Sequence, residues 1–226
     1  MTISLKKSKD DALIIQRQNA TWQDYVAVRD DAAIDWQKIS YSSDSGWLWA
    51  DMGKEGPNHA SFSDLMTMIF GLCALLHPEV PIQSYGRCLI EKPNTQACAP
   101  DLVLYKGGNI PRWQLGEPRR ISTTRHRLPD FVGEVGDTTL SLDLDEQKQL
   151  YASLGILEYW VIDVKCSRIF AFGLSELGVY EPIETSQTLA GLPIALVEQA
   201  LERLATETNT AAASWLMQQL QTLLKK

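Results

Sequence analysis

Short apolar runs separated by polar turns occupy the middle of the chain. Runs typical of strands cover residues 82–91, 101–105, 130–135, 158–164 and 168–174. A long apolar segment from Ser61 to His77 predicts a buried helix, with Ser61 and Asp64 at capping-box spacing. A second helix is predicted over residues 143–155, because Gly155 suits the position after a helix end. This order of helix, three strands, helix and strand predicts an α/β fold with a mixed central β-sheet flanked by helices.

The two ends of the chain carry simpler patterns. Near the start, Thr21 and Asp24 predict the N-cap of a short helix. Two alternating runs around residues 43–46 predict a hairpin. The last part, about residues 193–226, is amphipathic and helical. We therefore expect a single domain over residues 1–226, with a core at about 36–182 and a helical C-terminal extension at about 193–226.

Composition narrows the class of protein. With 226 residues, of which 45% are hydrophobic and 22% charged, the chain fits an ordinary soluble globular protein. Its four cysteines and three histidines show no zinc-site spacing, and scattered cysteines favour a reducing, cytoplasmic setting. The apolar segment at 61–77 is short and interrupted for a membrane span, so no membrane association is expected.

Arginines gather in one segment of an otherwise acidic chain. The net charge of −7 argues against non-specific coating of nucleic acid, but it leaves room for a local basic groove. Five of the ten arginines lie between residues 112 and 127, against a single acidic residue, Glu117; they are Arg112, Arg119, Arg120, Arg125 and Arg127. The segment is either a solvated surface loop or a site of contact with nucleic-acid phosphates.

Two predicted strands begin with Pro–Asp, at Asp101 and Asp130, and the second carries Glu134 at its centre. A buried carboxylate costs several kcal/mol unless a charge or hydrogen bonds compensate it. Asp101 and Glu134 could meet across neighbouring strands and bind a hard cation such as Mg²⁺, which needs only one or two protein carboxylates. Asp130 is interpreted as structural, because an Asp after proline can cap a turn.

A lysine near such a cation would orient water or neutralise the transition state. Gly136, two residues after Glu134, leaves no lysine on the strand. Lys148 lies at the edge of the apolar stripe of the following helix and could reach along the sheet toward Glu134. Gln147 is the competing candidate, and an ordinary surface lysine within "DEQKQ" is the alternative interpretation of Lys148.

The run "PDFVGEVGDTTLSLDLDEQKQLYASLGILEYWVIDV" resembles the Uma-two family of restriction-endonuclease-like proteins, within the PD-(D/E)XK nuclease superfamily. The resemblance extends back through "APDLVLY" and "EGPNHASFSDL" and covers about residues 40–180. It implies a restriction-endonuclease-like core with a four-stranded mixed sheet, and Mg²⁺-dependent hydrolysis of phosphodiesters, with Mn²⁺ as a substitute. Asp101 and Glu134 then take the roles of metal carboxylates, and Lys148 that of the lysine moved from strand to helix.

The sequence departs from that pattern at Gly136, and relatives with a lysine four residues before the tyrosine match Gln147 here. An acid from the first helix is often used as well, for which Asp64, with His59 ahead of it, is the candidate. The resemblance predicts a metal-dependent endonuclease acting on DNA, with phosphate contacts from Arg119, Arg120, Arg125 and Arg127, and a homodimer. A non-catalytic nucleic-acid-binding or scaffold protein that retains the fold is the alternative.

Overall fold

The computed structural model describes residues 5–7 and 13–224. Within it the chain forms two compact units, each assembled from separate segments of sequence. Unit 1 contains the segment up to Glu55 together with Arg87–Pro100 and Pro111–Arg127. Unit 2 contains Gly56–Gly86, Asp101–Ile110 and the segment from Leu128 onward. The expected single domain over residues 1–226 stays a prediction.

Unit 1 is built on a seven-stranded sheet and one helix. The sheet order is β1-β2-β4-β3-β7-β6-β9, and only β6 and β9 pair in parallel among these neighbours. The strands are β1 (Leu5–Lys7), β2 (Leu13–Arg17), β3 (Lys38–Ser42), β4 (Trp47–Asp51), β6 (Ile90–Lys92), β7 (Gln96–Cys98) and β9 (Ile121–Ser122). Helix α1 (Trp22–Asp30) packs on this sheet through an apolar core that includes Tyr25 and Val28.

Both local predictions for the start of unit 1 are confirmed. Thr21 is the N-cap of α1, and Thr21 and Asp24 form a complete capping box. Strands β3 and β4 form the antiparallel hairpin around residues 43–46. Gly46 ends the turn at φ 62°, and a Cβ there would lie 2.9 Å from the Cα of Asn19, so only glycine fits.

Unit 2 contains a six-stranded mixed sheet in the order β13-β12-β11-β10-β8-β5. Strands β10 and β11 are parallel and the other neighbours are antiparallel. The strands are β5 (Ile82–Gly86), β8 (Leu102–Lys106), β10 (Phe131–Gly136), β11 (Glu158–Asp163), β12 (Arg168–Leu174) and β13 (Tyr180–Pro182). The mixed α/β fold is therefore confirmed, with a larger sheet than the four strands implied by the resemblance.

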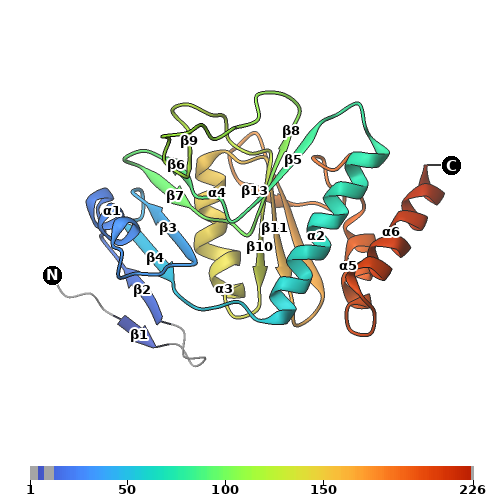
Figure 1. Ribbon diagram of the computed structural model, residues 1–226, viewed down its shortest axis with the longest axis horizontal. Coiled ribbons are helices and arrows are strands. Elements are labelled where there is room, and N and C mark those ends of the chain that lie inside the picture. Colours follow the sequence, from blue (N-terminus) through green and yellow to red (C-terminus); the bar gives the residue numbers. More distant parts are fainter. Residues whose placement is uncertain (1–4, 8–12, 225–226) are drawn as a thin grey trace. The chain divides into compact units, whose positions relative to one another are not determined.

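Helices cover both faces of this sheet (Figure 1). One face packs with α2 (Pro57–Leu76), α5 (Ile194–Arg203) and α6 (Asn209–Leu223) around an apolar core. Trp160 and Ile162 of β11 point into this core. The alternate residue Tyr159 points to the opposite face, where it contacts Tyr151 of α4 (Lys148–Leu154). The predicted helical C-terminal segment corresponds to α5 and α6.

Two boundaries were predicted wrongly. Residues 82–91 are not one strand, because β5 ends at Gly86 and belongs to unit 2, whereas β6 starts at Ile90 and belongs to unit 1. Arg87 has a left-handed backbone at φ 47°, which interrupts the extended run. Helix α2 starts at Pro57 with Gly56 as N-cap, four residues before Ser61, so Ser61 and Asp64 form no capping box there.

Helix α2 is also less enclosed than its sequence predicted. One face is buried in the core of unit 2, but Met68 and Leu75 are exposed, the latter by 72%. Among the described helices, α2 alone has the length and hydropathy that would suit a membrane span. Its buried face, which packs against the sheet, is that of a core helix, as predicted.

The helix predicted over residues 143–155 is part of one continuous helical segment, in which a π-helical turn separates two α-helical parts. It runs from α3 (Leu140–Leu142) through the π-helical turn η1 (Asp143–Gln147) into α4. It ends at Gly155, whose φ of 85° confirms the predicted C-terminal glycine. The π turn determines which polar side chains face the sheet.

Candidate active site

Strands β8 and β10 place Asp101 and Glu134 opposite each other. The antiparallel register pairs Gly133 with Leu102, so Glu134 and Asp101 occupy the next facing positions at the start of β8. Facing residues of antiparallel strands point to the same side of a sheet. Both side chains are buried, with Asp101 3% and Glu134 0% exposed. The sequence placed these carboxylates on neighbouring strands, and the register brings them together.

Hydrogen bonds orient each carboxylate. The backbone N–H of Val135 donates to Asp101 Oδ2 over 2.8 Å, and Nε2 of His59 lies 3.4 Å from the same oxygen. The Tyr151 hydroxyl donates a short hydrogen bond to Glu134 Oε1. The strand backbone, the first turn of α2 and helix α4 thus hold the pair from three directions.

Asp143, in η1, adds a third buried carboxylate to this face of the sheet. It is 1% exposed, and the Thr139 hydroxyl donates to its Oδ2 over 2.7 Å. The Tyr159 hydroxyl donates to its backbone carbonyl over 2.9 Å. A Cβ on Gly136 would lie only 3.1 Å from Asp143 Oδ2, so the Asp143 carboxylate stands next to the position where a strand lysine was expected.

The three buried carboxylates, Asp101, Glu134 and Asp143, affect the pKa of the Tyr159 hydroxyl. Complete burial raises the pKa of the Tyr159 hydroxyl well above its usual value, and the charges of Asp143, Glu134 and Asp101 raise it further. All three carboxylates therefore lie within electrostatic range of one phenol. The site is acidic, has the Nε2 atom of His59 beside Asp101, and contains tyrosine hydroxyls that donate hydrogen bonds.

The two candidates for the third catalytic residue have different environments. The Lys148 ammonium lies 3.8 Å from the centre of the Phe172 ring, on β12, two strands away from β10. Gln147 is 2% exposed and faces inward from η1. The structure thus brings Asp101 and Glu134 together, whereas Lys148 lies over an aromatic ring and Gln147 is the more deeply buried of the two.

The other candidate residues, Asp130, Asp64 and His59, have different environments. Asp130 accepts a 2.7 Å hydrogen bond from the backbone N–H of Lys106, which fits its structural interpretation. Asp64 is exposed on the second turn of α2. His59, which was only a secondary candidate, contacts Asp101 directly.

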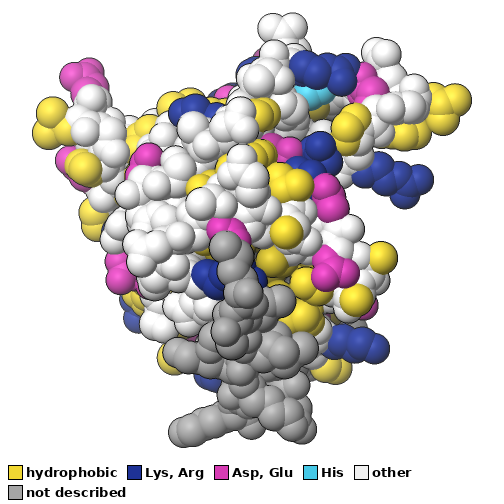
Figure 2. Space-filling view, turned by 90° about the vertical axis from the view of Figure 1, so that its left-hand side faces the viewer, with side chains coloured by type: hydrophobic (Ala, Val, Ile, Leu, Met, Phe, Trp, Pro, Cys, Tyr) yellow, Lys and Arg dark blue, Asp and Glu magenta, His cyan; other side chains and the backbone are white. Residues whose placement is uncertain are grey.

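The arginine-rich segment belongs to unit 1 and makes several intramolecular contacts. Arg120 pairs with Glu91 over 2.7 Å, Arg125 pairs with Glu117, and Arg119 lies over the Trp113 ring. Basic and acidic side chains are interspersed on the face shown in Figure 2. Phosphate contact by Arg119, Arg120, Arg125 and Arg127 stays a prediction.

Sequence reasoning missed Asp143, Tyr151 and Tyr159. A usable signal was present, since Asp143, Gln147 and Tyr151 are spaced at i, i+4 and i+8 and so share one helix face. The leucines around them dominated the predicted apolar stripe. Tyr159 follows from strand alternation, because it faces the side of the sheet opposite Trp160.

Comparison with known proteins decides the family. The sequence model of Uma2, described as "Putative restriction endonuclease", matches residues 22–210, which is most of the chain. The chain belongs to the Uma2 family. The resemblance seen in the sequence is thereby confirmed and extends over both units. A search of curated proteins found no match to this Uma2 chain.

A solved structure shares the fold of this Uma2 protein. It is described as a "putative nuclease belonging to DUF820" from Anabaena variabilis, and it aligns with a TM-score of 0.53 over 87% of this chain and 98% of its own. At 13% identity the likeness concerns the fold alone. Family and fold together identify a restriction-endonuclease-like protein.

The donor set of the site fits a hard divalent cation. Mg²⁺ prefers carboxylate and water oxygens, and three buried carboxylates on one face of a sheet supply such ligands. The same set suits Mn²⁺. A cation would also offset the mutual repulsion of buried negative charges, which is otherwise costly.

Proposed function

We propose that this Uma2 protein is a metal-dependent endonuclease that hydrolyses phosphodiester bonds in DNA. The observation that carries the proposal is the facing pair of buried carboxylates, Asp101 and Glu134, at the junction of β8 and β10. Such a pair is expensive to bury without a function for its charge. Membership of a family described as "Putative restriction endonuclease" supports phosphodiester hydrolysis as the reaction class.

In this proposal Asp101 and Glu134 hold Mg²⁺ or Mn²⁺, and Asp143 is a further carboxylate that would bind the ion through water. The bound ion would lower the pKa of a water molecule and stabilise charge on the phosphoryl oxygens. The chain's own residues prepare the site. Tyr151 fixes the orientation of Glu134, and the Val135 N–H fixes that of Asp101, so neither carboxylate must reorganise during the reaction.

A third residue would supply positive charge or orient water. Lys148 remains the candidate taken from the resemblance, but its ammonium must leave the Phe172 ring to act at Glu134. Gln147 lies on the buried side of η1 and could orient water through its amide. Phosphate contacts by the arginine-rich segment, a homodimer and a cytoplasmic location complete the proposal.

One set of observations favours a second function, that of a non-catalytic protein that binds nucleic acid or acts as a scaffold. Gly136 provides no strand lysine, and the Lys148 ammonium lies over Phe172. A site with carboxylates but without a nearby lysine could bind a cation and still turn over poorly. The two functions differ in whether bound DNA is cut.

The decisive experiment compares the wild type with Glu134→Gln on supercoiled plasmid in Mg²⁺, Mn²⁺ or EDTA. Glu158→Gln is a matched control, because Glu158 is a buried glutamate (2% exposed) on the neighbouring strand β11 but faces the opposite side of the sheet. We expect metal-dependent nicking by the wild type and by Glu158→Gln, and loss of about 100-fold or more in Glu134→Gln.

Two results would decide against the nuclease. One is a wild type that is inert on plasmid, single-stranded DNA and RNA while calorimetry detects no ion binding. The other is equal cleavage by wild type and Glu134→Gln. Retention of DNA in a gel-shift assay without any cleavage would instead establish the second function.

A further inference from the structure

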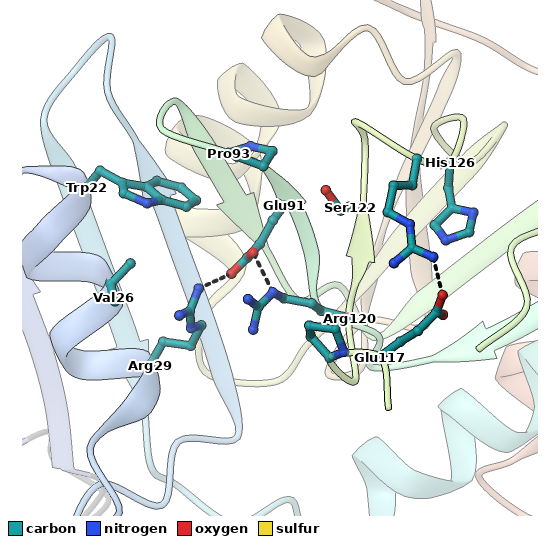
Figure 3. Close-up of a pocket in the computed structure, with 11 residues that line it drawn as sticks. Trp22, Val26, Arg29, Glu91, Pro93, Glu117, Arg120, Ser122 and His126 are labelled. Carbon is teal, nitrogen blue, oxygen red and sulfur yellow. Dashed lines mark hydrogen bonds and ion pairs between the residues drawn. The ribbon is translucent and has the colours of Figure 1, made fainter. Parts of the chain in front are cut away.

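Unit 1 contains a pocket of about 370 Å³ that the proposed nuclease site does not use. Its volume lies in the range of small-molecule binding sites. Trp22 and Val26 line one side of it together with Arg29, and Glu117, Ser122 and His126 line the other (Figure 3). The apolar lining comes from Trp22, Val26, Pro93 and Pro118, and the polar lining from Arg29, Glu91, Glu117, Arg120, Ser122, Arg125 and His126.

The floor of the pocket is a buried carboxylate with three partners. Glu91 is 3% exposed, and its Oε1 accepts hydrogen bonds from the Tyr25 hydroxyl and from Arg29 Nη1, both over 2.6 Å. Its Oε2 pairs with Arg120 Nε over 2.7 Å. Glu91 therefore holds two guanidinium groups in fixed positions on the pocket wall, one from α1 and one from the segment before β9.

Arg120 is fixed by its Nε atom alone. Its two terminal nitrogens make no hydrogen bond to the described part of the chain, and its side chain is 30% exposed at the pocket. Paired terminal N–H groups of this kind suit the oxygens of a phosphate. The Ser122 hydroxyl and the His126 ring line the same end. The lining holds three arginines and two glutamates, and Arg29 also pairs with Asp30 while Arg125 pairs with Glu117. Arg120 is therefore the arginine whose terminal nitrogens can receive a phosphate.

Trp22 forms a rigid wall at the apolar end. Its ring packs against Tyr25 at 4.8 Å and edge-on against Tyr41 at 5.8 Å between ring centres. Because these contacts fix the indole, a planar ligand could stack on it without ordering a mobile side chain. Stacking on an aromatic side chain accepts any base, because every base has a π-face.

We propose that this pocket binds a nucleoside monophosphate, with the base against Trp22 and the phosphate on the terminal nitrogens of Arg120. The same chemistry is offered by a free nucleotide and by the 5′-phosphorylated end of a nucleic-acid strand. The pocket shares Arg120 and Arg125 with the phosphate contacts proposed for the arginine-rich segment, but its ligand binding does not require cleavage, because every lining residue belongs to unit 1 and the Asp101–Glu134 pair belongs to unit 2.

Calorimetric titration of the full chain in EDTA, which prevents cleavage, tests the proposal with AMP, adenosine and inorganic phosphate. We expect AMP to bind with a Kd below about 1 mM, and adenosine and phosphate alone to bind at least about tenfold more weakly, because each uses one end of the pocket. A 12-nucleotide strand with either a 5′-phosphate or a 5′-hydroxyl distinguishes the two sources. Preference for the phosphorylated strand identifies strand ends, and equal binding of both strands identifies the free nucleotide.

Two variants probe the two ends of the pocket. Trp22→Leu removes the planar wall, and Arg120→Lys keeps the charge beside Glu91 but loses the paired N–H groups. Each is expected to weaken AMP binding at least about tenfold. Arg17→Lys is the matched control, since Arg17 also belongs to unit 1 and forms an ion pair, with Asp24, but lies outside the pocket lining.

Thermal melting of each variant shows whether it is folded. Absence of AMP binding to the wild type at 1 mM ligand, or equal binding by wild type, Trp22→Leu and Arg120→Lys, would overturn the proposal, and would show that the Glu91 ion pairs serve only to hold unit 1 together. Glu134→Gln should bind AMP as the wild type does, whether or not the protein proves to be a nuclease.

Discussion

Replacing Glu134 by Gln should stabilise the metal-free protein and remove its response to Mg²⁺. Glu134 is fully buried and faces Asp101 across the antiparallel register. Two unit charges about 5 Å apart at an effective dielectric constant of about 20 repel by about 3 kcal/mol. Glutamine has nearly the same shape, so the substitution removes this repulsion without creating a cavity.

The substitution also weakens one favourable contact. The Tyr151 hydroxyl donates to a charged carboxylate in the wild type and would donate to a neutral amide oxygen in the variant. That change costs about 1 kcal/mol, because hydrogen bonds to charged groups are the stronger ones. The net gain in the free energy of unfolding is therefore about 2 kcal/mol, or about 4–8 °C in Tm for a chain of this size.

Mg²⁺ should narrow the difference in unfolding free energy between Glu134→Gln and the wild type. At a Mg²⁺ concentration ten times the Kd, binding to the native state adds about 1.4 kcal/mol to the wild type. The variant lacks one of the two facing carboxylates and should respond little. Thermal melts in EDTA and in a Mg²⁺ series, followed by circular dichroism, measure both effects.

Glu158→Gln provides the contrasting control. Its carboxylate accepts hydrogen bonds from Trp160 Nε1 and from the Thr188 N–H, each over 2.8 Å, so its loss should destabilise the protein by about 1–3 kcal/mol. A Glu134→Gln protein that melts below the wild type in EDTA would refute the argument from repulsion. An equal rise of Tm with Mg²⁺ in both proteins would refute the metal site.

Three further predictions concern separate parts of the chain. Thr21→Ala removes the capping hydrogen bond to the Asp24 N–H and should lower stability in urea denaturation by about 1 kcal/mol; an unchanged midpoint would contradict this. Burial raises the pKa of the Cys73 thiol to about 11. Between about pH 9 and 11 the unfolded chain therefore releases this proton while the folded chain keeps it. The free energy of unfolding should fall by about 2–3 kcal/mol as the pH rises through this range. Cys73→Ala should flatten that part of the urea-midpoint profile, and a profile identical to the wild type would exclude the thiol as its cause. Gln147→Lys should raise metal-dependent cleavage about tenfold or more, whereas Lys148→Met should change it little; the reverse result in a plasmid-nicking assay would assign the role to Lys148.

Local patterns were sufficient for the elements that carry the carboxylate pair. The Pro–Asp starts and the apolar residues after them placed Asp101 and Glu134 on two neighbouring strands, and the register of β8 and β10 makes them face each other. A sheet position requires only alternation and strand order, both of which are local or nearly local properties.

The division of residues 82–91 between two sheets could not be predicted in this way. The run was interpreted as one strand, and the break between the two strands lies at the left-handed backbone of Arg87. Arginine is an uncommon residue at positive φ, so it gives no local signal of a break. Long-range pairing assigns the two halves to different sheets, since Ile82–Gly86 pairs with β8 and Ile90–Lys92 pairs with β7.

The π-helical turn η1 was not predicted, because the hydrophobic pattern was read with an α-helical period and a π turn takes more residues per turn. The α-helical projection nevertheless placed Gln147 nearer the centre of the inward stripe and Lys148 at its edge. The burial of Gln147 agrees with that placement, and the Lys148 ammonium lies over the Phe172 ring. Which of the two residues acts in catalysis stays a prediction.

Gly136 on β10 lies next to the carboxylate of Asp143. A Cβ at position 136 would lie 3.1 Å from Asp143 Oδ2, which is tighter than most Cβ contacts, while Thr139 holds that carboxylate in place. A lysine at position 136 would therefore require Asp143 to shift by a few tenths of an ångström. Gly136 leaves room for the Asp143 carboxylate, so β10 and η1 contribute a second and a third buried acid to this face of the sheet, and the repulsion among them rises accordingly.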